Sequence, residues 1–375
     1  MISQIVSDFA DLNTMQLKID GYRDVFFRQS GGFHLPEVRY LGKFEKTQPQ
    51  NQFKDNHIYI SIPIKNQEEI IVKVLKTLFQ NTKHNLVIGL LFDNCTDESL
   101  SKVTNFLNSE FLKFSNVITI YLVKSSDELF EATCENILFQ FCESDYFLSL
   151  QSDIFFEDPT FIARSLTAFN KLPNLFAISG RAVVPFRQIT RIDKMFEKII
   201  RSTSSIRDLK SLFTNKKILG AYIPKLSYYG DISNMPFKRM SFSTRQMSTL
   251  YLGEAIIRGP IIWSSKIFRR LGGFNDISYF LGRDDCDLCL RASRNGYVVG
   301  YLPSSSFSIP SDGTTRKPIT NEVATAMQVR TQISNSNPGE LYKLWQKPNK
   351  KISLIFFKIR YLLRGLLFNQ GKITL

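Results

Sequence analysis

The chain has 375 residues, of which 43% are hydrophobic and 22% charged, and its formal net charge is +14. This composition excludes a disordered polymer, and the length suffices for one large or two modest domains. Five cysteines in so long a chain exclude a disulfide miniprotein, and their odd number favours a reducing compartment. The first 20 residues lack the apolar run of a signal peptide, and no stretch reaches the roughly 18 uncharged apolar residues of a membrane span. We therefore expect a cytoplasmic protein.

The positive charge is concentrated in two segments. Residues 181–249 contain fourteen Lys or Arg and four acids, and residues 341–375 contain eight Lys or Arg and no acid. These surpluses of +10 and +8 exceed the net charge of +14, so the rest of the chain carries −4. A nucleic-acid-binding domain would combine clustered charge with a recognisable motif. We find no such motif and expect no nucleic-acid partner, but rather a slightly acidic body with basic segments that face something anionic.

Strands and helices alternate from residue 57 onward. Apolar runs predict strands at 58–64, 86–92, 117–123, 146–150 and 298–302, and helical spacing predicts helices at 68–80, 99–112 and 129–142. Such alternation is typical of an α/β fold with a mostly parallel sheet flanked by helices, in which ligands bind beyond the carboxyl ends of the strands. Asp93 and Asp153 closely follow two of these strands, so we expect both at that edge.

The remaining segments break this pattern. We treat residues 1–56 as an N-terminal extension and residues 181–252 as a helical basic insertion that covers the acceptor side, although a solvated helical face explains the charge equally well. Residues 341–375 are predicted to form a basic, apolar C-terminal helix. Two interpretations of this helix stay open: it docks on the body, or it lies at a membrane interface and contacts anionic lipid, which would make the protein peripheral on the membrane.

Three loops at expected strand ends are acidic. They contain Asp93 with Asp97, then Asp153, and then Asp284, Asp285 and Asp287. Any one of these residues is most simply a turn or helix-cap residue. Several carboxylates at one edge repel one another unless a cation or a proton lies between them, and Mg²⁺ held by one or two carboxylates relies on substrate phosphates. A diphosphate with a divalent metal, together with a second carboxylate as general base, accounts for the cluster.

Five motifs, in this order, resemble those of family 2 glycosyltransferases of the GT-A fold, over roughly residues 57–180 and 253–312. They are Ile62-Pro63-Ile64-Lys65-Asn66-Gln67, Phe92-Asp93-Asn94-Cys95-Thr96-Asp97, Cys134-Glu135-Asn136, Gln151-Ser152-Asp153, and Gly272-Gly273-Phe274 followed by Asp284-Asp285-Cys286-Asp287-Leu288. The resemblance implies a Rossmann-like sheet in which residues 57–180 bind a nucleotide-sugar donor and residues 253–340 form the acceptor and catalytic half. It also implies inversion at the anomeric carbon.

The resemblance further implies roles for individual residues. The nucleotide-sugar-binding residues would be Pro63, Lys65, Gln67, Asp93, Gln151, Ser152 and Asp153. Asp93 would accept a hydrogen bond from the nucleobase, and Asp153 would hold a divalent metal, Mn²⁺ or Mg²⁺, against the departing diphosphate. The catalytic residues would be Asp285, as general base for the acceptor hydroxyl, and Asp284, which would orient the acceptor or the donor sugar. Asp287 would cap the helix that follows.

The chain departs from the family pattern where the metal binds. Gln151 replaces the first acid of the Asp-X-Asp motif. Many relatives supply a late histidine ligand, but the only histidines here are His34, His57 and His84. Ser308 or Asp312 would have to substitute, or the metal would be held with more water.

We therefore expect a glycosyltransferase that acts on a glycan or lipid-linked acceptor, which the basic insertion suggests is anionic. UDP is the default nucleotide, and GDP and dTDP stay open, as do the sugar and the linkage. The alternative is a catalytically degenerate domain that binds nucleotide or glycan as a scaffold. A nucleotidyltransferase would show a Gly-rich loop after the first strand, where residues 65–68 have no Gly. Cys286 and Cys289 are a lone pair without the four ligands of a zinc site.

Overall fold

The computed structural model describes residues 8–46, 57–180, 215–218, 221–224, 248–253, 256, 258–308, 319–339 and 372–375. The strands are β1 (Val38–Glu45), β2 (His57–Ile64), β3 (Asn85–Asp93), β4 (Val117–Ser125), β5 (Tyr146–Ser149), β6 (Ile154–Phe155), β7 (Leu175–Ser179), β8 (Asn215–Ile218), β9 (Ala221–Pro224), β10 (Thr249–Gly253), β11 (Ile261–Ser264), β12 (Val298–Tyr301), β13 (Phe307–Ser308) and β14 (Lys372–Thr374). The α-helices are α1 (Phe9–Gln29), α2 (Ile71–Asn81), α3 (Ser99–Glu110), α4 (Phe130–Leu138), α5 (Phe161–Lys171), α8 (Ser265–Arg270), α9 (Asp284–Arg294) and α10 (Asn321–Ser336).

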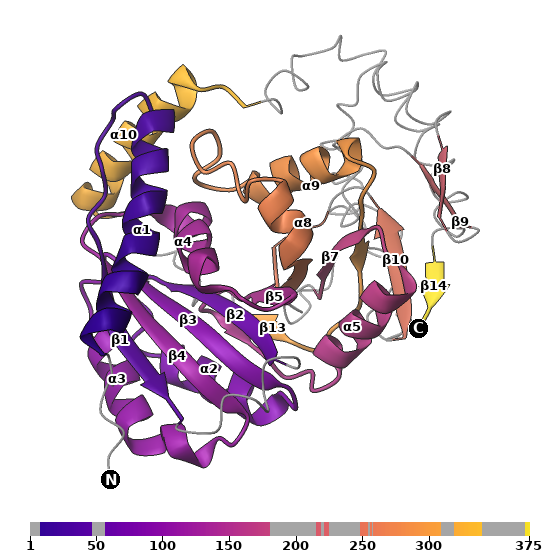
Figure 1. The fold of residues 1–375 in the computed structure, drawn as a ribbon, viewed down its shortest axis with the longest axis horizontal. Helices are drawn as coiled ribbons and strands as arrows, with labels where there is room; N and C mark the ends of the chain where they lie inside the picture. The colour runs from indigo at the N-terminus through magenta and orange to yellow at the C-terminus, as the bar shows by residue number, and fades with distance from the viewer. Residues whose placement is uncertain are drawn as a thin grey trace, which may run out of the picture.

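A ten-stranded sheet forms the centre of the molecule, in the order β1-β4-β3-β2-β5-β11-β7-β12-β10-β14 (Figure 1). The pairs β4-β3, β3-β2, β2-β5 and β7-β12 are parallel. The other pairs are antiparallel. When these pairings are followed across the sheet, β1, β11 and β10 run in one direction and all the other strands run in the opposite direction. The prediction of an α/β fold with a mostly parallel sheet flanked by helices is confirmed.

Helices cover both faces of the sheet, because successive side chains of a strand point to opposite faces. On β2, Ile58, Ile60 and Ile62 belong to the core formed with α2, α3 and α5. Tyr59 points to the opposite core, which contains residues of α1, α4, α8 and α9. Its hydroxyl donates a hydrogen bond of 2.6 Å to the carbonyl of Leu138 at the end of α4. The central strands are therefore buried on both faces, as their continuous apolar runs predict.

The predicted strands and helices between residues 57 and 150 are all present, and β12 is the strand predicted near residue 300. The segment treated as an N-terminal extension contributes α1 and β1, and β1 pairs with β4 at one edge of the sheet. No helix among the described residues is long and apolar enough to cross a bilayer.

The two basic segments are described only in part. Within residues 181–252, β8 and β9 pair with each other, and β10 belongs to the main sheet. Most of residues 341–375 lies outside the described residues, and the prediction of a membrane-binding helix lies there with it. The last residues of that segment form β14 on β10 rather than the helix that we expected.

One antiparallel strand determines which loops meet at the carboxyl edge. Strand β11 lies between β5 and β7, and its first residue, Ile261, pairs with Ser149 and Ser179 at the ends of those strands. The residues just before β11 therefore lie at the same edge as the carboxyl ends of the parallel strands. This is the edge at which ligands bind in open α/β sheets.

Candidate active site

A cavity of about 310 Å³ opens at the carboxyl ends of β2, β3 and β5. Its lining includes all but one of the predicted nucleotide-sugar-binding residues, namely Pro63, Lys65, Asp93, Gln151, Ser152 and Asp153. The chain just before α10 and the first two turns of this helix contribute Ile319, Thr320, Glu322, Val323 and Met327 to the same lining. Sequence reasoning did not anticipate α10 at this site. Residues of three separate motifs and a late helix thus form one polar and apolar cavity.

Gln67 is the predicted binding residue that the structure places outside this lining. It is 2% exposed, and its backbone N–H donates a 2.8 Å hydrogen bond to the Ser99 hydroxyl at the start of α3. Gln67 therefore fastens the loop after β2 to α3.

Asp93 is the last residue of β3, and its side chain binds the backbone at the start of α4. Its two carboxylate oxygens accept hydrogen bonds from the backbone N–H groups of Leu129 (2.7 Å) and Phe130 (3.0 Å). Phe130 has a φ of 65°, a left-handed conformation that costs free energy and persists only when its surroundings hold it. Burial, with a smaller contribution from nearby Glu128, raises the pKa of Asp93 to about 7, and the two backbone hydrogen bonds and Lys65 oppose this shift. Nucleobase recognition by Asp93 stays a prediction.

A second carboxylate stands beside Asp93 in the cavity wall. Lys65 donates a 2.7 Å hydrogen bond to the carbonyl of Asn94 and forms an ion pair with Glu128. Burial raises the pKa of Glu128, and the Lys65 ammonium opposes that shift. Glu128 was not predicted because it follows a strand end without any motif around it.

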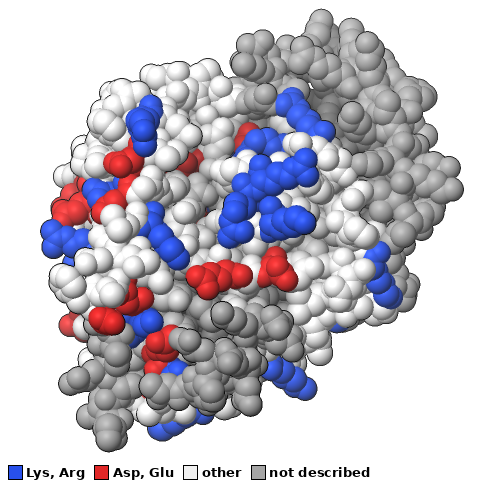
Figure 2. All heavy atoms as spheres, in the orientation of Figure 1, with Lys and Arg blue, Asp and Glu red and all other residues white. Residues whose placement is uncertain are grey.

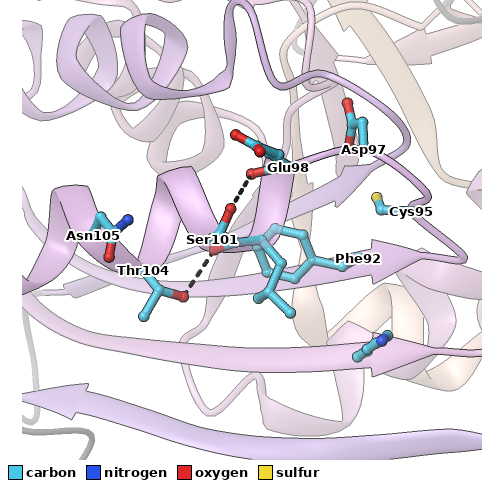
Figure 3. Close-up of a pocket in the computed structure, with 9 residues that line it drawn as sticks. Phe92, Cys95, Asp97, Glu98, Ser101, Thr104 and Asn105 are labelled. Atoms are coloured by element: carbon cyan, nitrogen blue, oxygen red, sulfur yellow. Dashed lines mark hydrogen bonds between the residues drawn. The ribbon is translucent and has the colours of Figure 1, made fainter.

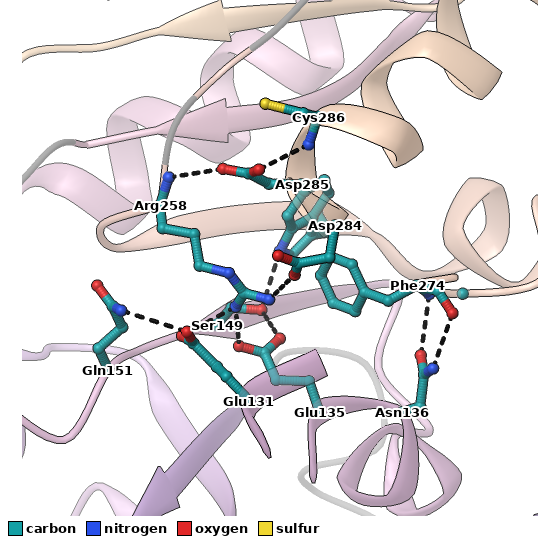
Figure 4. A network of polar contacts seen from close by, with 12 residues as sticks. Glu131, Glu135, Asn136, Ser149, Gln151, Arg258, Phe274, Asp284, Asp285 and Cys286 are labelled. Carbon is teal, nitrogen blue, oxygen red and sulfur yellow. Dashed lines mark hydrogen bonds and ion pairs between the residues drawn. The ribbon is translucent and has the colours of Figure 1, made fainter. Parts of the chain in front are cut away.

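Behind the cavity, Arg258 lies at the centre of a network of carboxylates (Figure 4). Its guanidinium donates to Glu135 at 2.7 Å and to Glu131 at 3.0 Å, and it forms an ion pair with Asp284. Its backbone N–H donates a 3.0 Å hydrogen bond to Asp285. The two predicted catalytic acids are thereby connected to α4, which also borders the cavity.

The predicted catalytic acids do not line the cavity, but one glutamate links them to it. Glu131 lines the cavity, and the side-chain amide of Gln151 lies 3.5 Å from its carboxylate. On its other side Glu131 binds Arg258, which holds Asp284. A single contact between Glu131 and Arg258 therefore connects the cavity lining to the acidic pair, Asp284 and Asp285.

Burial has the largest effect on the pKa values of Asp285 and Glu131 in this network. It raises the pKa of Asp285 to about 6, with Asp284 adding to the shift and Arg258 opposing it. It raises the pKa of Glu131 to about 8, again against Arg258. Burial alone would lower the pKa of Arg258, but Asp284, Glu131 and Glu135 raise it well above its usual value. The guanidinium therefore stays charged, while burial shifts the pKa values of Asp285 and Glu131 toward neutral pH.

The residues predicted to hold a metal supply few donors. No group of three His, Cys, Asp or Glu side chains suited to a metal ion occurs among the described residues. Asp153 lies in the cavity wall next to Gln151 and Ser152. A single carboxylate fits a hard divalent ion that takes its remaining oxygens from a diphosphate and water, and does not fit an ion held by protein side chains alone.

Three other predicted features can be placed. Asp287 forms an ion pair with Arg291 at 2.8 Å, one turn further along α9, so its carboxylate serves that pair rather than a helix cap. Cys286 and Cys289 are both free thiols. Of the two proposed substitutes for the missing histidine, Ser308 lies in β13, and Asp312 lies outside the described residues.

A second hollow, of about 500 Å³, lies between α3 and the ends of β3 and β4 (Figure 3). Asp97 in its wall accepts hydrogen bonds from the backbone N–H groups of Glu68 and Ser99, both 3.0 Å long. The Ser101 hydroxyl donates to the carbonyl of Glu98 at 3.0 Å. These groups serve the local fold of the loop and helix, so we place the candidate active site in the cavity at the sheet edge.

The described surface carries both signs of charge. Figure 2 shows basic side chains gathered near the middle of the described face, with acidic side chains beside them. Lys266, Arg269 and Arg270 are exposed on α8.

No protein-family model and no curated protein matches the chain. Among solved structures, it is similar to the mannosyltransferase PcManGT from Pyrobaculum calidifontis in complex with GDP-Man and Mn²⁺, with 11% identity, a TM-score of 0.44, and coverage of 94% of this chain and 97% of that chain. It is also similar to TarS 1–349 from S. aureus, with 9% identity, a TM-score of 0.42, and coverage of 83% and 72%. The same TarS fragment in complex with UDP-GlcNAc gives 11% identity, a TM-score of 0.42, and coverage of 82% and 72%. Identities and scores this low do not by themselves assign a function.

Proposed function

We propose that the protein is an inverting family 2 glycosyltransferase that moves a sugar from a nucleotide-sugar donor to a hydroxyl of a glycan or lipid-linked acceptor. One observation carries this proposal: residues of three separate motifs line a single cavity at the carboxyl edge of a mostly parallel sheet. That edge is where α/β sheets bind their ligands, and the volume of about 310 Å³ lies in the range of small-molecule sites.

The proposed reaction is a direct displacement at the anomeric carbon. Asp285 takes the proton of the acceptor hydroxyl, and the hydroxyl oxygen forms a bond to the anomeric carbon on the face opposite the diphosphate. The bond from that carbon to the diphosphate oxygen breaks, and the nucleoside diphosphate leaves with the electron pair. General-base assistance of this kind contributes about 10²–10⁴-fold to rate. Asp284, which is held by Arg258, would orient a sugar beside the reacting atoms.

In this proposal Asp153 would hold a divalent metal together with the diphosphate of the donor. When bound, Mn²⁺ or Mg²⁺ would neutralise charge on the leaving diphosphate. Lys65 adds a positive charge to the same cavity, although its ammonium is paired with Glu128. UDP is the first nucleotide to test, followed by GDP and dTDP.

The test is a donor-hydrolysis screen. The protein is incubated with UDP-, GDP- and dTDP-sugars and with Mn²⁺ or Mg²⁺, and release of nucleoside diphosphate is measured. We expect release from one donor, loss of that release in Asp153→Asn, and retention in Asp24→Asn, which changes an exposed acid of α1. A thermal shift with nucleotides but no turnover, with or without added glycan, would favour the scaffold instead. Neither turnover nor any thermal shift would contradict nucleotide-sugar binding altogether.

A further inference from the structure

Side chains from separate parts of the chain surround Arg258. Its guanidinium contacts Glu131 and Glu135 on α4 and Asp284 at the start of α9. The guanidinium carbon also lies 4.9 Å from the centre of the Phe274 ring. The side chain is only 13% exposed. An arginine so enclosed keeps one conformation, because moving it would leave several buried carboxylates without a cation.

The same residue holds Asp285 through its main chain. The Arg258 N–H donates a 3.0 Å hydrogen bond to Oδ2 of Asp285, and the N–H of Cys286 donates to Oδ1 at 2.7 Å. Asp285 itself is 5% exposed. The guanidinium anchors Arg258 to α4 and to Asp284. These side-chain contacts act together with the main chain to hold its N–H group, and hence the Asp285 carboxylate, in one orientation.

The fold explains why this position connects the two halves of the site. Arg258 precedes β11, and the carbonyl of Pro260 accepts a 2.7 Å hydrogen bond from Gly180, just after β7. The Arg258 backbone is thereby fixed to the carboxyl edge of the sheet, while its side chain reaches α4 beside the donor cavity. A planar guanidinium presents several N–H donors in a fixed fork and serves three carboxylates at once, which the ammonium of a lysine does less well.

We propose that Arg258 is a positioning residue that sets the orientation of the Asp285 carboxylate and links it to the donor cavity through Glu131. This inference rests on the proposed function, because it assigns to Arg258 a part in the same reaction. Arg258 does not itself line the cavity but contacts Glu131 in its wall, so it acts through other residues, Asp285 above all. It was not predicted from the sequence.

Arg258 acts on Asp285 through its positive charge and through the orientation that it imposes, and two variants separate these two effects. The charged groups that act on Asp285 are Asp284 on its own helix, Glu131 from α4, and Arg258, and Glu135 is paired with that same Arg258. The thiol of Cys289 also lies near Asp285. Arg258→Lys keeps the positive charge but loses the fork, whereas Arg258→Gln loses both. Because removal of the cation favours protonation of Asp285, only the Gln variant should change the pH at which the base loses its proton.

The experiment measures transfer from the donor found in the screen as a function of pH, with kcat and donor KM determined separately. For Arg258→Lys we expect kcat to fall roughly 10²-fold, the loss typical of a misplaced catalytic group. Its donor KM should stay within threefold of the wild-type value, and the acidic limb of its pH–rate profile should be unchanged. For Arg258→Gln we expect a similar loss of kcat and an acidic limb displaced to higher pH. The double variant Arg258→Gln with Glu135→Gln removes one charge of each sign, so Glu135 is not left buried without its cation if the single variant unfolds. Its acidic limb should move in the same direction but less far, because loss of the Glu135 charge opposes the shift.

The matched control is Arg164→Lys. Arg164 also forms an ion pair with a buried carboxylate, that of Asp158 at 2.6 Å, but on α5 and outside the candidate site. Arg164→Lys should lower the melting temperature about as much as Arg258→Lys does, without changing kcat or the pH profile. Wild-type kcat in Arg258→Lys, or an unmoved acidic limb in both Gln variants, would overturn the positioning role and leave the proposed function intact. A wild-type protein that transfers sugar from no donor would overturn both.

Discussion

The side-chain amide of Asn136 and the backbone of Phe274 form two reciprocal hydrogen bonds, each 2.9 Å long (Figure 4). Asn136 lies on α4, and Phe274 follows the two glycines that come after α8. Gly273 has a φ of 72°, and a Cβ at this position would meet the Asn136 carbonyl oxygen at 2.6 Å. Two of the motifs found in the sequence thus contact each other. Position 273 requires glycine both because of this close contact and because of its positive φ.

Gly273→Ala should therefore destabilise the protein more than Gly272→Ala. Gly272 also has a positive φ, of 77°, but nothing lies within 4 Å of its potential Cβ. We expect about 1 kcal/mol of lost stability for Gly272→Ala, from backbone strain alone. We expect about 3 kcal/mol for Gly273→Ala, which also breaks the hydrogen bonds to Asn136. Urea unfolding of both variants measures the difference, and equal losses would refute the role of the close approach.

Much of the architecture could be predicted because the relevant patterns are local. The continuous apolar run that ends at Asp93 fixes a buried strand and places its carboxylate at the sheet edge. The spacing of apolar residues between Ile71 and Phe79 fixes a helix. In both cases the residues that determine the element lie within it.

The network behind the cavity could not be predicted, because long-range topology creates it. Arg258 precedes an antiparallel strand inserted between β5 and β7, and no local pattern predicts that insertion. Glu131 and Glu135 are one helical turn apart in a predicted helix, where a carboxylate pair ordinarily indicates a solvated face. Glu135 is buried and Glu131 lines the cavity because of what packs against α4. The available signal in the sequence was a charged residue, Arg258, just before a Gly-Pro pair.

Glu131 should make stability depend on pH. Burial raises its folded-state pKa to about 8, above the ordinary value near 4.5. The folded protein therefore binds this proton more tightly than the unfolded chain, and the associated stability, fully present below about pH 4.5, is lost as pH rises toward 8. In Glu131→Gln this loss is absent, so the stability of the variant relative to wild type should increase between pH 5 and pH 8. Urea unfolding across this interval measures it, and parallel pH curves for the two proteins would contradict the shift.

The proposed general base predicts an acidic limb in the rate of transfer. Asp285 acts as base only when it is ionised, and burial raises its pKa to about 6. The rate should therefore fall about tenfold per pH unit below pH 6 and level off above it. Asp285→Asn should lower kcat by about 10²–10⁴-fold while donor affinity stays within threefold. Asp287→Asn is the matched control, because it removes a nearby acid that pairs with Arg291. A transfer rate in Asp285→Asn equal to that of wild type would exclude this residue as the base.

Removal of metal tests the role of Asp153. Asp153 lines the candidate site beside Gln151, which stands where family 2 glycosyltransferases have a further acid, so the motif would offer this ion one carboxylate. An ion held mainly by diphosphate oxygens should bind poorly without nucleotide and strongly with it. We expect EDTA-stripped protein to bind a nucleoside diphosphate at least tenfold more weakly than protein with Mn²⁺, measured by calorimetry. Asp153→Asn should lose this difference, and Gln151→Asp, which restores the usual pair, should enlarge it. Equal nucleotide affinity with and without Mn²⁺ in the wild-type protein would exclude a metal-assisted donor site and leave Lys65 as the positive charge in the cavity wall.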